Sequence, residues 1–149
     1  MSTLSIDAGP DAPALPATTI GGALDLAVEQ HGDREALVSV QQGLRFTYRE
    51  LSDAVDKVAR GLVARGIEKG DRVGIWSPNC AEWVFVQYAT ARLGAILVNI
   101  NPAYRSHELQ YVLNQSGIRL LIAAPSFKTS DYGAMIDEVR GECSALTDV

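Results

Sequence analysis

The sequence predicts an α/β protein: a partial parallel sheet with helices on both faces and a short hairpin near the N-terminus. The main observation is the stretch 66–102, in which two apolar runs, 72–76 and 95–100, flank a helical segment. A strand–helix–strand unit of roughly 30 residues is typical of a βαβ crossover, which makes its two strands parallel. The helix between them carries only Glu82 and Arg92 as charges, so we expect it to be buried on more than one side.

A third apolar run and two more helices continue this alternation toward the C-terminus. The run 120–124 is typical of a buried strand, and Pro125 stops it. Before it we expect a short helix that Ser106 caps and Gly117 ends, and after it a helix that begins at Ser130. The apolar residues of these helices are Leu109, Val112, Leu113, Met135, Ile136 and Val139. Strands alternating with helices of this size indicate a parallel sheet covered on both faces.

The N-terminal part predicts a lead-in followed by a helix. Residues 1–17 hold several prolines among Ala, Ser and Asp, and we expect them to be disordered, with 18–149 as the folded unit. Thr18 or Thr19 caps a first helix that runs to about His31. Its apolar stripe is Ile20, Leu24, Ala27 and Val28.

A hairpin and a well-marked helix come next. Strands 36–40 and 44–46 are joined by a turn at 41–43. Thr47 and Glu50 form a capping box at the start of the helix. Its apolar stripe is Tyr48, Leu51, Val55, Val58, Ala59 and Leu62. Its polar face offers two i,i+4 ion pairs, Asp53 with Lys57 and Asp56 with Arg60.

Glycine and asparagine predict the ends of the two long helices. Gly66 is placed to end the helix that begins after Thr47, and Ile67 makes the capping contact just beyond this glycine. Asn79 is the expected cap of the central helix, with Glu82 as its capping-box partner, and Gly94 is placed to end that helix.

Composition excludes several classes of protein. The chain has 149 residues, 47% apolar and 21% charged, as expected for a globular domain with its own core. A net charge of −5 and the lack of a basic run argue against nucleic acid as a partner. The sequence predicts no transmembrane segment, since no apolar run reaches ~18 residues, and no secretory signal. Cys80 and Cys143 lie far apart, so we expect reduced thiols and a cytoplasmic protein.

The carboxyl ends of the strands are the expected location of any ligand. Three loops qualify, 77–79, 101–105 and 125–128, and they share one edge if their strands are parallel. These loops are either part of a site or plain connections, and the sequence leaves both interpretations open.

Few side chains at these positions suggest chemistry. The sequence has no Walker-type phosphate loop, no G-x-G-x-x-G and no G-x-S-x-G. His31 and His107 stand alone, so a surface role is favoured for both. Cys80, in the first turn of a helix, is either an activated thiol or a packed, inert one, and we favour the second.

Three larger side chains also have a structural and a functional interpretation. Trp76 and Trp83 are expected to fill the core or an interface rather than stack on a ligand. Lys128 follows a strand end and either meets an anionic ligand or is simply solvated. The acidic residues offer no convergent pair for acid–base work. The sequence therefore assigns no catalytic, cofactor-binding or metal-ligating residue.

Several short motifs, in order and with their spacing, resemble the amino-terminal part of the adenylate-forming (AMP-binding) family, which includes the acyl-CoA synthetases, related ligases and luciferases. The motifs are F-T-Y-R-E-L (46–51), K-G-D-R-V (69–73), S-P-N with E-W (77–83), L-G-A (93–95) and N-P-A-Y with E-L (101–109). The N-P-A-Y version, with F-K-T-S-D-Y at 127–132, is most similar to fatty-acyl-CoA ligases for medium or longer chains. The resemblance covers 19–146 and makes 18–149 the N-terminal part of an incomplete adenylation domain.

The resemblance implies a two-step reaction. ATP and a fatty acid give an acyl-adenylate with the help of Mg²⁺, and coenzyme A then takes the acyl group. The family's phosphate loop, ribose-binding acidic residue and C-terminal lysine all fall after the matched segment, so no site residue carries over. We therefore expect an N-terminal segment of a fatty-acid–CoA ligase that is inactive by itself. The alternatives are a non-catalytic α/β interaction module or subunit fragment, which self-associates through an exposed sheet edge, and a small nucleotide-binding domain.

Overall fold

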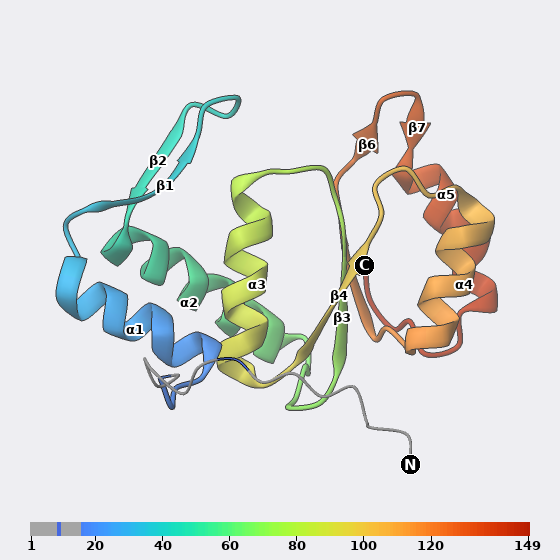
Figure 1. The fold of residues 1–149 in the computed structure, drawn as a ribbon. Helices are drawn as coiled ribbons and strands as arrows, with labels where there is room; N and C mark the ends of the chain where they lie inside the picture. The colour runs from blue at the N-terminus through green and yellow to red at the C-terminus, as the bar shows by residue number, and fades with distance from the viewer. Residues whose placement is uncertain (1–8, 10–15) are drawn as a thin grey trace, which may run out of the picture.

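The computed structural model describes residues 9 and 16–149, so most of the expected lead-in over 1–17 lies outside the described residues (Figure 1). The helices are α1 (Ile20–His31), α2 (Tyr48–Ala64), α3 (Ala81–Leu93), α4 (Ser106–Ser116), α5 (Tyr132–Val139) and the 3-10 helix η1 (Arg140–Glu142). The strands are β1 (Glu35–Ser39), β2 (Leu44–Thr47), β3 (Arg72–Trp76), β4 (Ile96–Ile100), β5 (Leu120–Ala123), β6 (Ser126–Phe127) and β7 (Ser130–Asp131). This order confirms the predicted α/β class.

The main sheet has three parallel strands in the order β4-β3-β5. Val73 of β3 lies opposite Leu97 of β4 on one side and Leu120 of β5 on the other. The strand–helix–strand unit is therefore a parallel crossover, as the sequence predicts. The predicted hairpin is also present, because β1 and β2 pair in antiparallel fashion. The sequence did not indicate the small β6–β7 hairpin, whose strands have only two residues each.

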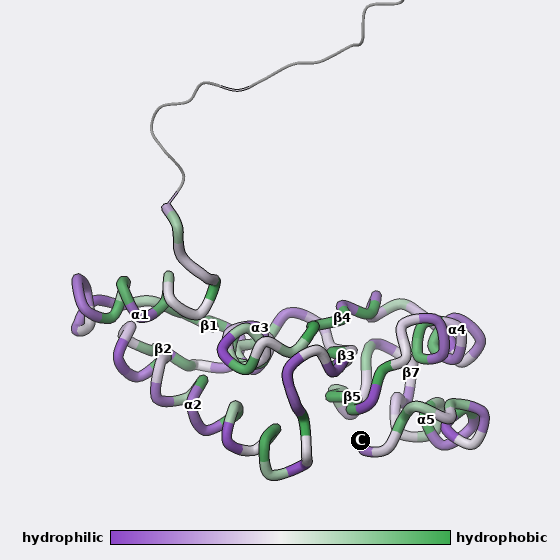
Figure 2. The backbone as a smooth tube through the Cα atoms, turned by 90° about the horizontal axis from the view of Figure 1, so that it is seen from below, coloured by the Kyte–Doolittle hydropathy of each residue, from purple (hydrophilic) through white to green (hydrophobic). Residues whose placement is uncertain are grey.

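Helices cover both faces of this sheet. Figure 1 shows α1, α2 and α3 on one side and α4 and α5 on the other, and the view from below in Figure 2 shows the same division. Side chains of a strand alternate between faces, so each side has its own core. Val73 and Leu120 belong to the cluster under α2 and α3, whereas Trp76 and Leu121 belong to the cluster under α4 and α5.

The central helix α3 lies between the sheet and the pair α1–α2 (Figure 1). Its residues Val86, Ala89 and Thr90 are buried, which confirms the expectation that it is covered on more than one side. The predicted apolar stripe of α1 is only partly correct. Leu24 is buried, but Ile20 at the first position of the helix is 58% exposed.

Arg92 of α3 ties the three helices of this layer together. Its side chain is 17% exposed. Its guanidinium donates to Asp25 Oδ1 of α1 at 2.5 Å, and on α2 to Ser52 Oγ at 2.9 Å and Asp56 Oδ1 at 2.5 Å. The predicted pair of Asp56 with Arg60 is therefore wrong, because Asp56 turns to a more buried cation that is fixed by α3.

The other predicted pair on α2 is also wrong. Asp53 and Lys57 are not within ion-pair distance of each other, although both belong to the described part of the chain. Both side chains are exposed, where an ion pair contributes little free energy against the entropy of two long side chains.

Helix ends follow the local signals in some places and not in others. Thr19 caps α1 by accepting from the Gly22 N–H, and the capping box of Thr47 and Glu50 is complete. The hydrogen bonds from Thr47 hold the pKa of Glu50 below its usual value. Gly66, Gly94 and Gly117 all adopt positive φ after their helices, as predicted.

The predicted caps of α4 and α5 are each displaced by one residue. Ser106 is the first residue of α4, and its hydroxyl donates to Glu138 of α5 instead of capping. Glu108 accepts from the backbone N–H of Arg105, which is the cap residue. Asp131 rather than Ser130 caps α5, because its carboxylate accepts from the Ala134 N–H at 3.0 Å.

We expect Arg92→Met to lower the free energy of unfolding by about 1–3 kcal/mol, the usual effect of removing hydrogen bonds to charged groups. The substitution keeps the apolar stem but leaves Asp25 and Asp56 without their shared cation. Urea unfolding monitored by circular dichroism would measure the loss. Arg60→Met on the exposed side of α2 is the control, expected to change stability by no more than about 0.5 kcal/mol. Equal losses in the two variants would contradict the role of Arg92.

Candidate functional site

The carboxyl ends of β3, β4 and β5 lie at the same edge of the sheet because the strands are parallel. The three predicted loops therefore share one edge, at the top of Figure 1. The β1–β2 turn reaches the same edge, since Gln42 contacts the start of α3. No pattern in the sequence indicated that this turn would lie there.

A cavity of ≈ 370 Å³ opens at this edge between β3, β5 and the N-terminus of α3. Its lining residues are Gln42, Ile75, Ser77, Cys80, Glu82, Ile122, Ala123, Ala124 and Pro125. Two of the three predicted loops contribute to it, 77–79 through Ser77 and 125–128 through Pro125. The loop 101–105 is not part of this lining.

The start of α3 differs from the prediction. Asn79 does not cap the helix, and the cap residue is Cys80, whose side chain makes no capping hydrogen bond. Gln42 Oε1 accepts from the Ala81 N–H at 2.8 Å, and Gln42 Nε2 donates to Glu82 Oε2 at 2.9 Å. The hydrogen bond from Gln42 holds the pKa of Glu82 below its usual value, with the backbone N–H as a second cause. Glu82 is therefore an anion near neutral pH.

Two buried aromatic rings hold the loop after β4. Trp76 and Tyr132 are fully buried and stack with ring centroids 3.5 Å apart and an interplanar angle of 8°. Trp76 Nε1 donates to the Asn101 carbonyl at 3.0 Å, and the Tyr132 hydroxyl donates to the Pro102 carbonyl at 2.5 Å. Burial raises the pKa of Tyr132. The Asn-Pro of the N-P-A-Y motif is thus a backbone docking point, and Trp76 belongs to the core as predicted.

The remaining candidate side chains lie apart from one another. His31 and His107 are exposed, on α1 and α4. Lys128 has φ 52° in the β6–β7 turn, and its ammonium lies 5.3 Å from the centroid of the Phe127 ring. Trp83 is half-buried on α3. The structure brings none of these four residues into the edge cavity.

The two cysteines are both free, as predicted. Cys80 is half-buried, with its Sγ 3.4 Å from Ser77 Oγ. Cys143 is buried, and burial raises the pKa of its thiol.

The edge cavity does not fit a nucleotide triphosphate or its metal ion. Its lining has one carboxylate, Glu82, and no lysine or arginine. Glu82 already bonds to Gln42. Among residues 9 and 16–149, no three His, Cys, Asp or Glu side chains gather closely enough to hold a metal ion. The lining is mostly apolar, so the cavity can receive an apolar group.

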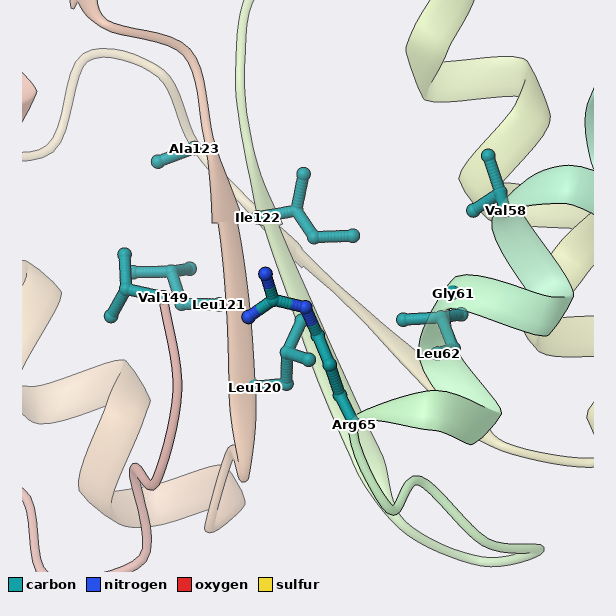
Figure 3. A pocket seen from close by; sticks show the side chains of 9 residues that line it. All are labelled: Val58, Gly61, Leu62, Arg65, Leu120, Leu121, Ile122, Ala123 and Val149. Atoms are coloured by element: carbon teal, nitrogen blue, oxygen red, sulfur yellow. The ribbon is translucent and has the colours of Figure 1, made fainter.

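A second, more apolar groove lies along β5 on the side of α2 (Figure 3). It measures ≈ 390 Å³ and is lined by Val58, Gly61, Leu62, Arg65, Leu120, Leu121, Ile122, Ala123 and Val149. The last residues of the chain start to pair with the outer edge of β5. Leu121 N donates to the Asp148 carbonyl at 3.0 Å in a parallel bridge, and Arg65 forms an ion pair with the Asp148 carboxylate.

A comparison with known protein families identifies the class of protein to which the chain belongs. The family model described as AMP-binding enzyme matches residues 24–148. The chain is therefore a member of the AMP-binding enzyme family, and the resemblance found in its motifs is confirmed.

Individual relatives and solved structures within this family show which kind of enzyme the chain is similar to. The chain is 44% identical over 125 residues to the mitochondrial medium-chain acyl-CoA ligase ACSF2 of Mus musculus, covering 84% of this chain and 20% of that protein. It is 38% identical to the putative acyl-CoA synthetase YngI of Bacillus subtilis (strain 168), with 84% and 23% covered. The N-terminal domain of FACL13 from Mycobacterium tuberculosis superposes with a TM-score of 0.80 at 29% identity, with 87% and 32% covered.

The chain spans about a fifth of the length of the ACSF2 relatives that it matches. The likeness to the FACL13 domain confirms the predicted fold, that of the N-terminal part of an acyl-CoA synthetase. Within the described residues, no helix is both long enough and apolar enough to cross a membrane.

We expect Tyr132→Phe to lower the free energy of unfolding by about 1–2 kcal/mol, because it leaves the Pro102 carbonyl without its donor. The ring stack with Trp76 stays in place, so the loss reports the hydroxyl alone. Thermal and urea unfolding would measure it. Tyr111→Phe on α4, where the tyrosine is 63% exposed, is the matched control. A variant at 132 as stable as the control would refute the docking role of this hydroxyl.

Proposed function

We propose that the chain is the N-terminal part of the adenylating region of an ATP-dependent ligase that joins fatty acids to coenzyme A. The proposed reaction forms an acyl-adenylate from ATP and a fatty acid with Mg²⁺, and then an acyl-CoA. The single observation that carries this proposal is the 44% identity to a medium-chain acyl-CoA ligase over 84% of the chain. We further propose a cytoplasmic location, although the name of that relative places it in mitochondria.

The described residues act as a scaffold in this proposal. Trp76 and Tyr132 fix the loop after β4, and Gln42 and Glu82 engage each other at the start of α3. The polar groups of these four side chains are therefore engaged in internal hydrogen bonds. We infer that nucleotide and coenzyme A contact residues outside this chain, and that residues 1–149 alone do not form acyl-CoA.

A chimaera tests this proposal. Residues 24–148 of this chain would replace the matching segment of the mouse medium-chain ligase. We expect the purified chimaera to form acyl-CoA from a medium-chain fatty acid, ATP and coenzyme A, because the segment supplies the same scaffold. The isolated 149-residue chain should form none.

As a control, the matching segment of the Bacillus subtilis relative would be placed in the same mouse ligase. This chimaera shows whether replacing the segment is by itself enough to abolish activity. A chimaera with this chain that folds but makes no acyl-CoA, while the Bacillus control is active, would overturn the proposal. Acyl-CoA formation by the isolated chain, free of host ligases, would overturn the inference that it is inactive alone.

We propose as a second function that the chain is an interaction module that self-associates through β5. The groove beside this strand is mostly apolar, and β5 is one of the two edge strands of the main sheet, with Asp148 bonded to its outer side at Leu121. Backbone groups of alternate strand residues face the same side, so the Ala123 N–H points outward like that of Leu121. Exposed apolar surface next to the part of this strand edge beyond the Asp148 bridge favours association.

We expect the chain to form dimers or larger species as its concentration rises, measured by light scattering after size-exclusion chromatography. Val58→Lys in the groove places a charge in the apolar contact and should raise the dissociation constant about tenfold or more. Val63→Lys on the same helix, at a residue that is 55% exposed and outside the groove, is the control. A monomer at all concentrations, or equal effects of the two variants, would contradict this second function.

A further inference from the structure

The N-terminus of α3 is held by a residue 39 positions earlier in the chain. Gln42 lies in the turn between β1 and β2, and its side chain uses both ends of its amide. Oε1 accepts from the Ala81 N–H at 2.8 Å and from Ser39 Oγ at 2.7 Å, while Nε2 donates to Glu82 Oε2 at 2.9 Å. A single amide therefore satisfies the helix backbone and the first acidic side chain of α3.

Among the described residues close to Ala81 in sequence, no side chain caps this N–H. The first N–H groups of a helix have no partner within the helix. The cap residue Cys80 makes no capping bond, and the hydroxyl of Ser77 donates to the Pro78 carbonyl instead. The backbone N–H of Ala81 thus depends on the hairpin turn.

Contacts at the base and at the tip of the hairpin fix the position of the turn relative to α3. At the base of the hairpin, Phe46 packs edge-on against Phe85 of α3 with ring centroids 5.2 Å apart. At its tip, Ser39 bonds to Gln42, and Gly43 takes the positive φ of 67° that closes the turn. Two separate contacts therefore fix where the Gln42 amide lies, which distinguishes it from a freely rotating surface glutamine.

We propose that Gln42 is a positioning residue, through which the β1–β2 hairpin fixes the start of α3 and the loop 77–80, and so sets one wall of the edge cavity. The cavity lining supports this, since Gln42 lies in the same wall as Ser77, Cys80 and Glu82. Without the amide, Ala81 and Glu82 at the start of α3, directly after the loop 77–80, lose their only ties to the hairpin turn among the side-chain hydrogen bonds of the described residues. The cavity mouth then widens on that side.

Hydrogen exchange of single amides in the full 149-residue chain tests the proposal. Gln42→Ala should speed exchange at Ala81 and Glu82 by about tenfold, the effect of losing a helix cap, and leave β4 amides unchanged. Gln41→Ala is the matched control, since Gln41 is exposed in the same turn and makes no side-chain hydrogen bond to a described residue. Equal protection of Ala81 in the two variants would overturn the proposal.

Exchanging the amide and the carboxylate between Gln42 and Glu82 distinguishes a positioning role of Gln42 from a general loss of stability. Gln42→Glu keeps an acceptor for Ala81 but sets two carboxylates against each other. The double variant Gln42→Glu with Glu82→Gln keeps that acceptor and restores a donor–acceptor pair, in which the amide at 82 donates to the carboxylate at 42. We expect the double variant to protect Ala81 better than Gln42→Glu alone by about fivefold or more. Additive effects of the two substitutions would show that the residues do not act through each other, and would overturn the proposal.

Discussion

The pairing of β3 with strands on both sides is the constraint on which the rest of the structure depends. β3 lies between β4 and β5, and both pairings are parallel. Parallel neighbours need crossover connections, and those connections place helices on the faces of the sheet. Gly74 at the centre of β3 allows close packing, since a Cβ there would lie 2.9 Å from Ile118 Cδ1. The central strand therefore determines three features: which faces the helices cover, which edge holds the carboxyl ends of the strands, and how closely Ile118 packs on the sheet.

Signals confined to a few neighbouring residues predicted local structure well. The capping box of Thr47 with Glu50 is present, and Gly94 and Gly117 end their helices in the left-handed conformation. The alternation of apolar runs and helices predicted the parallel sheet and its two covered faces. These features depend on backbone sterics and on partners within about one helical turn, so the chain carries their signal locally.

The errors at the start of α3 and on α2 arose because the actual partner lies far away in sequence. Asn79 looks like a cap, but the turn of a distant hairpin brings Gln42 to the backbone N–H of Ala81. Asp56 looks like a partner for a residue one turn on, but Arg92 offers a buried guanidinium that also bonds Asp25. At the candidate site, the sequence predicted the shared edge of the three loops. The sequence could not predict that Gln42 and Tyr132 would lie at this edge, because only tertiary packing brings them there.

The two faces of the sheet differ in how completely they are covered, and this difference bears on function. On the α4–α5 side, the stacked rings of Trp76 and Tyr132 close the core, and their polar atoms bond to backbone carbonyls. On the α2 side, apolar side chains of β5 such as Ile122 line both the edge cavity and the groove. Burying that surface is favourable by roughly 25 cal/mol per Å². A second layer of polypeptide on this side would therefore bury this apolar surface, and it would bring new side chains to the strand ends.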